Sequence, residues 1–442
     1  MQNAPLRPLW KAAALTALLV SCGQQGSAPQ TQATPFAVQT RDFAYVTTVS
    51  LSAGDTQQSL EREFGGEVAA FDEQAGYALI ATNQKPALSA QSTQRRQVVT
   101  EANQGRFTGG SFMATMGGRR SIWSGGDTSA SLGGRRSIWS GGQYLAVAEN
   151  TPTWKQINLE RGHALAPRLG EGVKVAVIDT GIDLAHPAFQ GTLAPQTDWW
   201  DFYGNDASPQ EEGSYASTTA RGYGHGTSVA GIVLQVAPNA KIIPLRVLGP
   251  DGSGDVLGVT KAIDWAVAKG AKVINLSLGS TSRTTAVQDA IKRATTAGVL
   301  VVSSAGNENL SAITYPAYDA ATGTTAGYRS LGVGSVDAYD RKSSFSNYGR
   351  MLETVAPGEN VYGPAPENQM ASWSGTSMAA PMAAGAMALA LGQGLKVALS
   401  DVTMKMAENG FDLYNNGMNE AYKDMLGKRR LDVAAFLSNV AQ

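Results

Sequence analysis

The sequence predicts an α/β fold with a mostly parallel central sheet, helices on both faces and a small α+β segment ahead of it. From about residue 151 onward, uniformly apolar runs alternate with helical stretches, which is typical of strands buried on both faces of a parallel sheet. Closer to the N-terminus, short β-branched runs surround one amphipathic helix. The chain has 442 residues, enough for one large domain with accessory segments.

Residues 1–22 are typical of a bacterial export signal. Arg7 and Lys11 precede a short apolar run, 12–20, that is too short to span a bilayer. The run ends in Leu-Val-Ser-Cys, which resembles the lipobox of bacterial lipoproteins and marks Cys22 for lipidation. A plain secretory signal with an incidental cysteine is the alternative. We therefore expect an exported protein of the cell envelope or exterior, whose link to a membrane is a lipid on Cys22.

Residues 23–104 are expected to form a polar tether and a small folded segment. The expected elements are a strand at 43–51, a helix that begins near Asp55 and stops at Gly65, and strands at 67–71 and 77–82. This segment contains few apolar residues, so it requires a partner to pack against. Residues 105–150 are rich in glycine and show no helical or strand period, so we interpret them as a linker.

Residues 151–442 carry the predicted central sheet. The expected strands are 173–178, 241–248, 272–278, 298–303, 331–336 and 353–356. The expected helices are 227–233, 259–269, 285–297, 378–391, 399–409 and 429–440.

Four polar residues lie at the ends of these elements in an order that suits acyl transfer. Asp179 ends an apolar strand, His225 opens a helix between two glycines, and Ser377 heads an alanine-rich helix. A serine is a competent nucleophile when a base removes its proton, and an aspartate fixes the tautomer of that base. Asn307, after a strand and Gly306, can donate its amide to an oxyanion.

The motifs around these residues resemble the subtilisin family of serine proteases. They are DTG at Asp179, GHGTSVAG at His225, AGN at Asn307 and GTSMAAP at Ser377, and the similarity extends from Trp154 to Leu437. The resemblance implies two substrate-binding edges, a primary pocket and an N-terminal prosegment. The residues implied are Gly252, Ser253 and Gly254 on one edge, Ser277, Leu278 and Gly279 on the other, and Ser304 and Gly306 in the pocket.

Several features depart from the family or argue for structural roles. Met382 stands where the family usually has a histidine outside the triad, and the stretch 317–330 is an insertion near the pocket. His163 and His186 are interpreted as structural. No cofactor or metal is expected. A calcium site at Asp201, Asp206, Glu211 and Glu212 is the alternative to a solvated acidic loop, which we favour.

We therefore expect a secreted serine endopeptidase made as a self-processed zymogen, with protein or peptide substrates and its own prosegment as partners. The formal net charge of −1 gives no indication of nucleic acid as a partner. A catalytically silent peptide-binding lipoprotein and an esterase with the same triad are the rival hypotheses.

The phrase GGRRSIWSGG occurs at 117–126 and again at 133–142. It is interpreted as a neutral duplication in a spacer, as a cleavable joint, or as a partner-binding segment. Cleavage within 117–150 would separate the catalytic domain from Cys22, so activation and release would be one event. The exact processing site is left open within 105–155.

Overall fold

The computed structural model describes residues 42–88, 92–93, 96–103, 107–109, 112–117, 147–321, 327–415 and 417–442. The predicted export signal with Cys22 lies outside the described residues, as do both copies of GGRRSIWSGG except Gly117. In the part that is described, none of the helices combines the length and apolar character needed to cross a bilayer.

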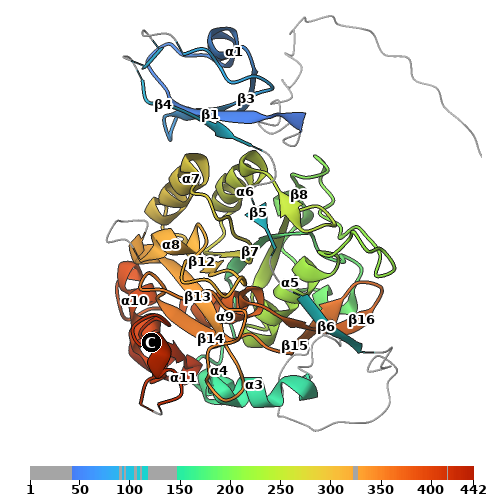
Figure 1. The fold of residues 1–442 in the computed structure, drawn as a ribbon, viewed down its shortest axis with the longest axis vertical. Coiled ribbons are helices and arrows are strands. Elements are labelled where there is room, and N and C mark those ends of the chain that lie inside the picture. Colours follow the sequence, from blue (N-terminus) through green and yellow to red (C-terminus); the bar gives the residue numbers. More distant parts are fainter. Residues whose placement is uncertain are drawn as a thin grey trace, which may run out of the picture. The chain divides into compact units, whose positions relative to one another are not determined.

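The central sheet has the order β17-β18-β14-β13-β12-β11-β7-β9-β8 in the described part of the chain (Figure 1). All neighbouring pairs are parallel except β17 with β18. This confirms the predicted fold class. Its strands are β7 (Lys174–Asp179), β8 (Trp200–Asp201), β9 (Lys241–Arg246), β11 (Val273–Leu276), β12 (Leu300–Ser304), β13 (Ser330–Val336), β14 (Thr354–Pro357), β17 (Gly410–Phe411) and β18 (Arg429–Leu431).

Helices cover both faces of this sheet, as the uniformly apolar strands predict. Val175 and Val177 of β7 belong to the core cluster beneath α5 and α9, whereas Ala176 and Ile178 belong to the cluster beneath α6 and α7. Successive residues of a strand point to opposite faces, so each strand supplies both cores. The helices are α3 (Thr151–Gln156), α4 (Leu159–Leu165), α5 (His225–Val236), α6 (Val256–Ala268), α7 (Thr285–Thr296), α8 (Ala317–Ala320), α9 (Thr376–Gln393), α10 (Val402–Glu408) and α11 (Val433–Val440).

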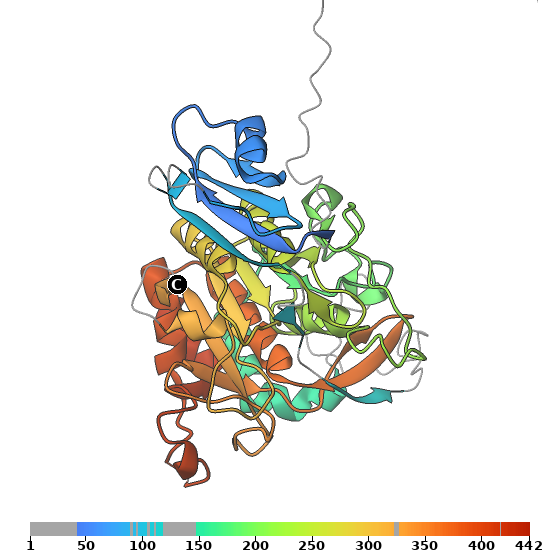
Figure 2. The same ribbon diagram turned by 45° about the horizontal axis from the view of Figure 1, so that its top comes forward.

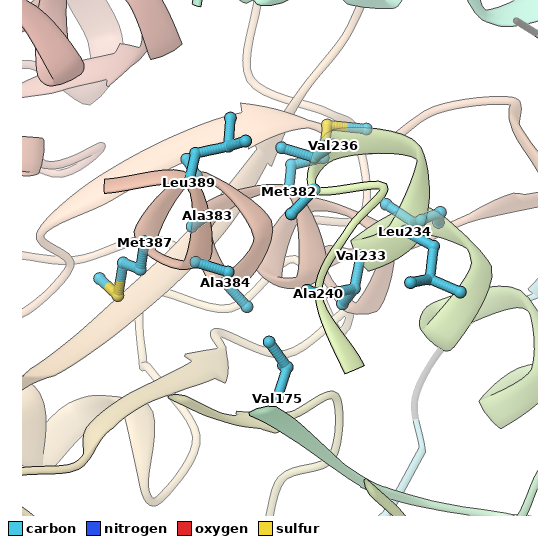
Figure 3. Close-up of a cluster of buried hydrophobic side chains, with 14 of the residues drawn as sticks. Val175, Val233, Leu234, Val236, Ala240, Met382, Ala383, Ala384, Met387 and Leu389 are labelled. Carbon is cyan, nitrogen blue, oxygen red and sulfur yellow. The ribbon is translucent and has the colours of Figure 1, made fainter. Parts of the chain in front are cut away.

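Helix α9 lies at the centre of the larger core. Figure 3 shows side chains of α5 and α9 meeting over Val175 of β7. Small residues let the two helices approach closely: a β-carbon on Gly385 would lie 2.6 Å from Cβ of Val236. Met382, the residue that departs from the family, is fully buried in this cluster, so it acts as core packing.

The N-terminal module, Asp42–Asn103, is a four-stranded sheet with one helix. Its elements are β1 (Tyr45–Ser50), α1 (Gln57–Phe64), β2 (Glu67–Asp72), β3 (Tyr77–Thr82) and β4 (Val98–Ala102), in the order β2-β3-β1-β4. Thr56 caps α1 in a capping box with Ser59, and Gly65 ends the helix in the left-handed conformation. The expected β-α-β-β pattern is confirmed, and β4 is an additional strand that the sequence analysis missed.

This module docks on α6 and α7 (Figures 1 and 2). The carboxylate of Glu101 accepts hydrogen bonds from the first amides of α7, Thr285 N and Ala286 N, at 2.9 and 2.8 Å. The carbonyl and side-chain oxygens of Asn103 accept from Val256 N and Leu257 N of α6, at 3.0 and 2.9 Å. These contacts satisfy helix N-terminal amides that would otherwise require water.

A second group of contacts joins the face of the module to the same helices. The Tyr77 hydroxyl donates to Asp264 of α6 at 2.5 Å, and the Arg293 guanidinium of α7 lies 3.6 Å from the centre of the Tyr77 ring. Burial raises the pKa of Tyr77, so this phenol stays protonated and donates. The thin apolar core predicted for the module is thus completed by docking.

The start of the glycine-rich segment is not a structureless linker, and that prediction is wrong at these residues. Phe107–Thr108 form β5, which pairs with β10 (Ser253–Gly254). Phe112–Gly117 form β6, which pairs with β16 (Gln369–Ser374) of the hairpin that begins with β15 (Val361–Ala365). The predicted start of the linker, residue 105, therefore lies just before a segment that pairs with strands of the large domain.

Replacing Gly385 with alanine should destabilise the protein. Alanine favours a helix over glycine by about 1 kcal/mol, but the added methyl would overlap Val236, and overpacking of this kind costs about 1–3 kcal/mol. We expect a lower melting temperature for Gly385→Ala by differential scanning fluorimetry. The exposed α7 substitution Lys292→Ala is the control, and a more stable Gly385→Ala would contradict the packing described.

Candidate active site

Asp179 and His225 form a buried pair at the carboxyl edge of the sheet. Asp179 is the last residue of β7 and His225 the first of α5, and their side chains are 1% and 2% exposed. Nδ1 of His225 lies 2.6 Å from Oδ1 of Asp179. Nε2 of His225 has no hydrogen-bond partner among the described residues.

Glycines allow these two elements to come together. Gly224 has a φ of +92°, a left-handed conformation that glycine adopts readily, and it directs the chain into α5. A β-carbon on Gly226 would lie 2.1 Å from the carbonyl oxygen of Gly181, so the loop after β7 and the start of α5 are in backbone contact. The glycines on both sides of His225 are therefore required by the geometry of the pair.

Ser377 stands in the first turn of α9, beside the loop after β11. Its hydroxyl donates to the carbonyl of Ser277 at 3.2 Å, and the hydroxyl of Ser277 donates to the carbonyl of Ser377 at 2.8 Å. Ser377 is fully buried. The reciprocal pair fixes the head of α9 against one of the two predicted substrate-binding edges.

Asn307 is held with its amide nitrogen free to donate. Its side-chain oxygen accepts from the backbone N–H and the hydroxyl of Thr376, at 2.8 and 3.1 Å. With the oxygen fixed beside α9, the NH₂ group points away from Thr376. Gly306, with a φ of +102°, makes the turn that presents Asn307 after β12. The predicted donor therefore lies directly beside the residue that precedes Ser377.

The two predicted substrate-binding edges are brought together, and a segment of the same chain lies between them. The backbone of Thr108 exchanges two hydrogen bonds with Gly279, both 3.0 Å long. On the other side, Gly109 N donates to the carbonyl of Gly252 at 2.9 Å, and Phe107 pairs with Gly254. Residues 107–109 thus form the middle strand of a three-stranded arrangement, and Phe107 is buried.

This bound strand leads directly to the catalytic residues. A β-carbon on Gly109 would lie 3.4 Å from Cε1 of His225. Beyond the two undescribed residues Gly110 and Ser111, the backbone resumes with Phe112 opposite Ser374, three residues before Ser377. The sequence analysis missed this occupancy because residues 107–117 carry no strand period.

The charge around His225 favours its protonated form. Burial alone would lower the pKa of His225, but the charge of Asp179 and its hydrogen bond raise that pKa above its usual value, and Glu211 adds to the rise. The other histidines are tied to backbone carbonyls: His163 to Val236 at 2.7 Å and His186 to Gln369 at 3.1 Å. Burial lowers the pKa of His186, which suits a structural role.

The interpretation of the acidic residues 201–212 as a solvated loop is wrong for two of its members. Asp201 is buried against Arg246, at 2.9 Å, and Glu211 is buried among hydroxyl groups. Across the described ranges, no group of three or more histidine, cysteine, aspartate or glutamate side chains is arranged to hold a metal ion. Glu211 is a residue that the sequence analysis did not connect with the site.

The two predicted pocket residues occupy the end of β12 and the following turn. Ser304 is buried, and its carbonyl accepts from the Thr314 hydroxyl at 3.3 Å. Gly306 N donates to the hydroxyl of Thr376 at 3.2 Å. Both residues therefore lie near the head of α9, and their role in selecting a side chain stays a prediction.

The chain is similar to known proteins over its large domain. Residues 170–418 match the subtilase family, peptidase S8. The chain is 37% identical to thermitase of Thermoactinomyces vulgaris over 269 residues, which are 58% of this chain and 88% of thermitase. It is 41% identical to subtilisin BL of Lederbergia lenta over 229 residues, 50% of this chain and 76% of that protein. A solved cold-adapted subtilisin-like serine proteinase matches 59% of this chain and 89% of its own, with 32% identity and a TM-score of 0.49.

Replacing Asp179 with asparagine should lower the pKa of His225, because it removes the charge and the hydrogen bond that favour the imidazolium. The pKa of His186 should not change, since its partner is the carbonyl of Gln369. NMR titration of both imidazoles, with Ser377→Ala in both proteins to prevent self-digestion, makes the measurement. An unchanged His225 midpoint would show that the pair does not interact as described.

Proposed function

Because the chain belongs to the subtilase family of serine proteases, with an Asp-His-Ser triad, we propose that Asp179, His225 and Ser377 form that triad and that Asn307 stabilises the oxyanion. The observation that carries this assignment is the buried 2.6 Å pair of Asp179 and His225, in which Nε2 of His225 has no hydrogen-bond partner among the described residues. The chain's own strand passes close to His225, because a β-carbon on Gly109 would lie 3.4 Å from Cε1 of that histidine.

The chemistry follows from these positions. The Ser377 oxygen attacks the carbonyl carbon of a peptide bond while Nε2 of His225 takes the serine proton. Asp179 accepts a hydrogen bond from the Nδ1–H group, which holds the neutral imidazole in the required tautomer and stabilises the imidazolium once it forms. The negative oxygen of the tetrahedral intermediate is held by the Asn307 amide and the Ser377 N–H. His225 then protonates the leaving amine, and water hydrolyses the acyl-enzyme by the same steps.

Substrates would bind as the middle strand between Gly252–Gly254 and Ser277–Gly279. Residues 107–109 already occupy this position, with the backbone hydrogen bonds of β-augmentation. Main-chain pairing supplies affinity that does not depend on the side chains of the substrate. This suits an endopeptidase that acts on extended protein segments. Ser304 and Gly306 are assigned to the wall of the primary pocket.

We further propose that the precursor cuts itself between Gly110 and Ser111. Thr108 pairs with Gly279 in an antiparallel register, and continuing that register by two residues along the edge strand leads to Ser277. The carbonyl of Ser277 is the acceptor of the Ser377 hydroxyl, which brings the nucleophile to this register position. Phe112 lies opposite Ser374, three residues before Ser377. The proposed bond therefore belongs to the short stretch between Thr108, which pairs with Gly279, and Phe112.

The N-terminal module would act as the prosegment and inhibitor. Glu101 and Asn103 hold it on α7 and α6, and β5, which follows the module in the chain, lies between the two predicted substrate-binding edges. After cleavage at Gly110–Ser111, a lipid on Cys22 would stay with the module. The exported catalytic domain, which would keep the GGRRSIWSGG repeat, would leave the membrane once the module dissociates. In this account the repeat lies beyond the first cut, and a cut within it would be a later trimming step.

Replacing Asn307 with alanine should lower kcat by about 10²–10³-fold and change KM little, because the lost donor acts on charge that develops in the transition state. Steady-state kinetics on a peptide substrate makes the comparison. Asn307 also holds the turn through its hydrogen bonds with Thr376. The melting temperature of the variant is therefore measured as well, and an unchanged value shows that the loss of kcat does not come from a disturbed fold. A variant with wild-type kcat would remove Asn307 from the oxyanion site.

The first self-cleavage should create an N-terminus at Ser111. The Ser377→Ala chain should remain intact, and mass spectrometry of the active chain at early times should show the fragment that begins at Ser111. A first cut within 118–146 would contradict the register.

Thr108→Pro should slow this cleavage at least tenfold, because proline removes the N–H that donates to Gly279 at 3.0 Å. Thr108→Ala keeps that N–H and is the matched control. Equal cleavage rates for the two variants would show that the strand pairing does not deliver the bond to Ser377.

A further inference from the structure

The carboxylate of Glu211 lies beside the Asp179–His225 pair and is hydrogen-bonded to the threonines Thr180 and Thr227. Glu211 is 5% exposed. Its Oε1 accepts from the hydroxyl of Thr180 at 2.5 Å, and its Oε2 accepts from the hydroxyl and the N–H of Thr227, at 2.5 and 3.0 Å. Three hydrogen-bond donors stabilise this buried carboxylate. Burying the charge without them would cost several kcal/mol.

Both threonines are adjacent to catalytic residues. Thr180 follows Asp179 in the chain, its N–H donates to Oδ1 of Asp179 at 2.8 Å, and its hydroxyl accepts from Gly226 N at 2.9 Å. Thr227 stands two residues after His225 in the first turn of α5. Glu211 therefore joins the loop that carries Asp179 to the helix that carries His225.

The backbone fixes Glu211 in this position. Its N–H donates to the carbonyl of Ile182 at 3.0 Å, and Ile182 N donates to the carbonyl of Pro209 at 3.0 Å. Asp183 N in turn donates to the hydroxyl of Thr227 at 2.9 Å, which closes the network. The side chain thus has little freedom to turn away when its charge changes.

The titratable groups around Glu211 come from three elements. Asp179 faces it from the end of β7, His225 from α5, and Tyr215 and Tyr223 from the loop that follows it. The charges of Asp183 and Glu367 raise the pKa values of the two tyrosines. Burial raises the pKa of Glu211 to about 7, with a further rise from Asp179 and an opposing effect of the threonine hydrogen bonds. The neighbouring Glu212 turns away to Arg246, at 2.7 Å.

We propose that ionised Glu211 is a positioning residue for the Asp179–His225 pair, and that its negative charge raises the proton affinity of the catalytic base. It acts through Thr180 and Thr227 and does not touch the substrate. Protonating the carboxyl removes one acceptor position, so one of its three donors loses its partner. This proposal rests on the assignment of His225 as the base.

The test compares Glu211→Gln with the neighbouring control Glu212→Gln. Glutamine keeps the shape of the side chain and removes its charge. We expect the acid limb of kcat/KM for Glu211→Gln to move to lower pH by about half a unit, because the imidazolium loses a stabilising charge. We also expect kcat to fall about tenfold with KM within about twofold. Glu212→Gln should keep the wild-type profile.

Glu211→Asp provides the rescue. Aspartate restores the charge on a shorter side chain, so the acid limb should return toward the wild-type position even if kcat stays low. An acid limb that does not move in Glu211→Gln, or one that moves equally in Glu211→Gln and Glu211→Asp, would overturn the proposal. Either result leaves the triad assignment intact, since that assignment is tested separately by the activity of Ser377→Ala.

A thermal measurement supplies a readout that does not depend on turnover. The folded-state pKa of Glu211 lies above its unfolded value of about 4.5, so its contribution to stability is present below that pH and is lost as pH rises through about 7. Both proteins in the comparison carry Ser377→Ala, and one of them also carries Glu211→Gln. The glutamine stays neutral, so the melting temperature of the double variant relative to that of Ser377→Ala alone should rise between pH 5 and 8. A constant difference across that range would contradict a raised pKa of Glu211 in the folded protein.

Discussion

The buried hydrogen bond between Asp179 and His225 is the interaction on which the site depends. It requires β7 and α5 to meet end to end, and the meeting is allowed by Gly224 and Gly226 and by the small residues that bring α5 close to α9. The same placement leaves Nε2 of His225 without a hydrogen-bond partner among the described residues. A parallel sheet suits this task, because the carboxyl ends of its strands collect at one edge, where loops and helix starts can present side chains.

The chain uses the same edge to restrain itself. Main-chain pairing at Gly252–Gly254 and Gly279 binds any extended segment, and in the intact chain that segment is its own residues 107–109. The N-terminal module keeps the segment in place through helix N-termini that accept Glu101 and Asn103 as caps. In the proposed function, inhibition, delivery of the bond to be cut and substrate recognition share one set of backbone hydrogen bonds.

Much of this could be predicted from the sequence, because the decisive features are local. The apolar runs fixed the main strands of the sheet, and glycines beside Asp179, His225 and Ser377 marked the turns that present them. Two features required the structure. Residues 107–109 and 112–117 pair as strands through main-chain contacts with residues that are distant in sequence. Such pairing does not require apolar and polar side chains to alternate, so the sequence shows no strand pattern there. Glu211 resembles a member of an acidic surface loop, and its burial depends on Thr180 and Thr227, far away in sequence. The threonines of DTG and GHGT were the available signal, since a hydroxyl next to each catalytic residue requires an acceptor.

Covalent labelling of the processed protein with a serine-directed phosphonate tests the central claim most directly. A phosphonate reacts with a serine that an adjacent base activates, and it requires an open cleft. The account predicts one adduct, located on Ser377 by peptide mass spectrometry, in the processed protein and none in precursor whose cleft is still filled. Folded, processed protein without an adduct on Ser377 would contradict it.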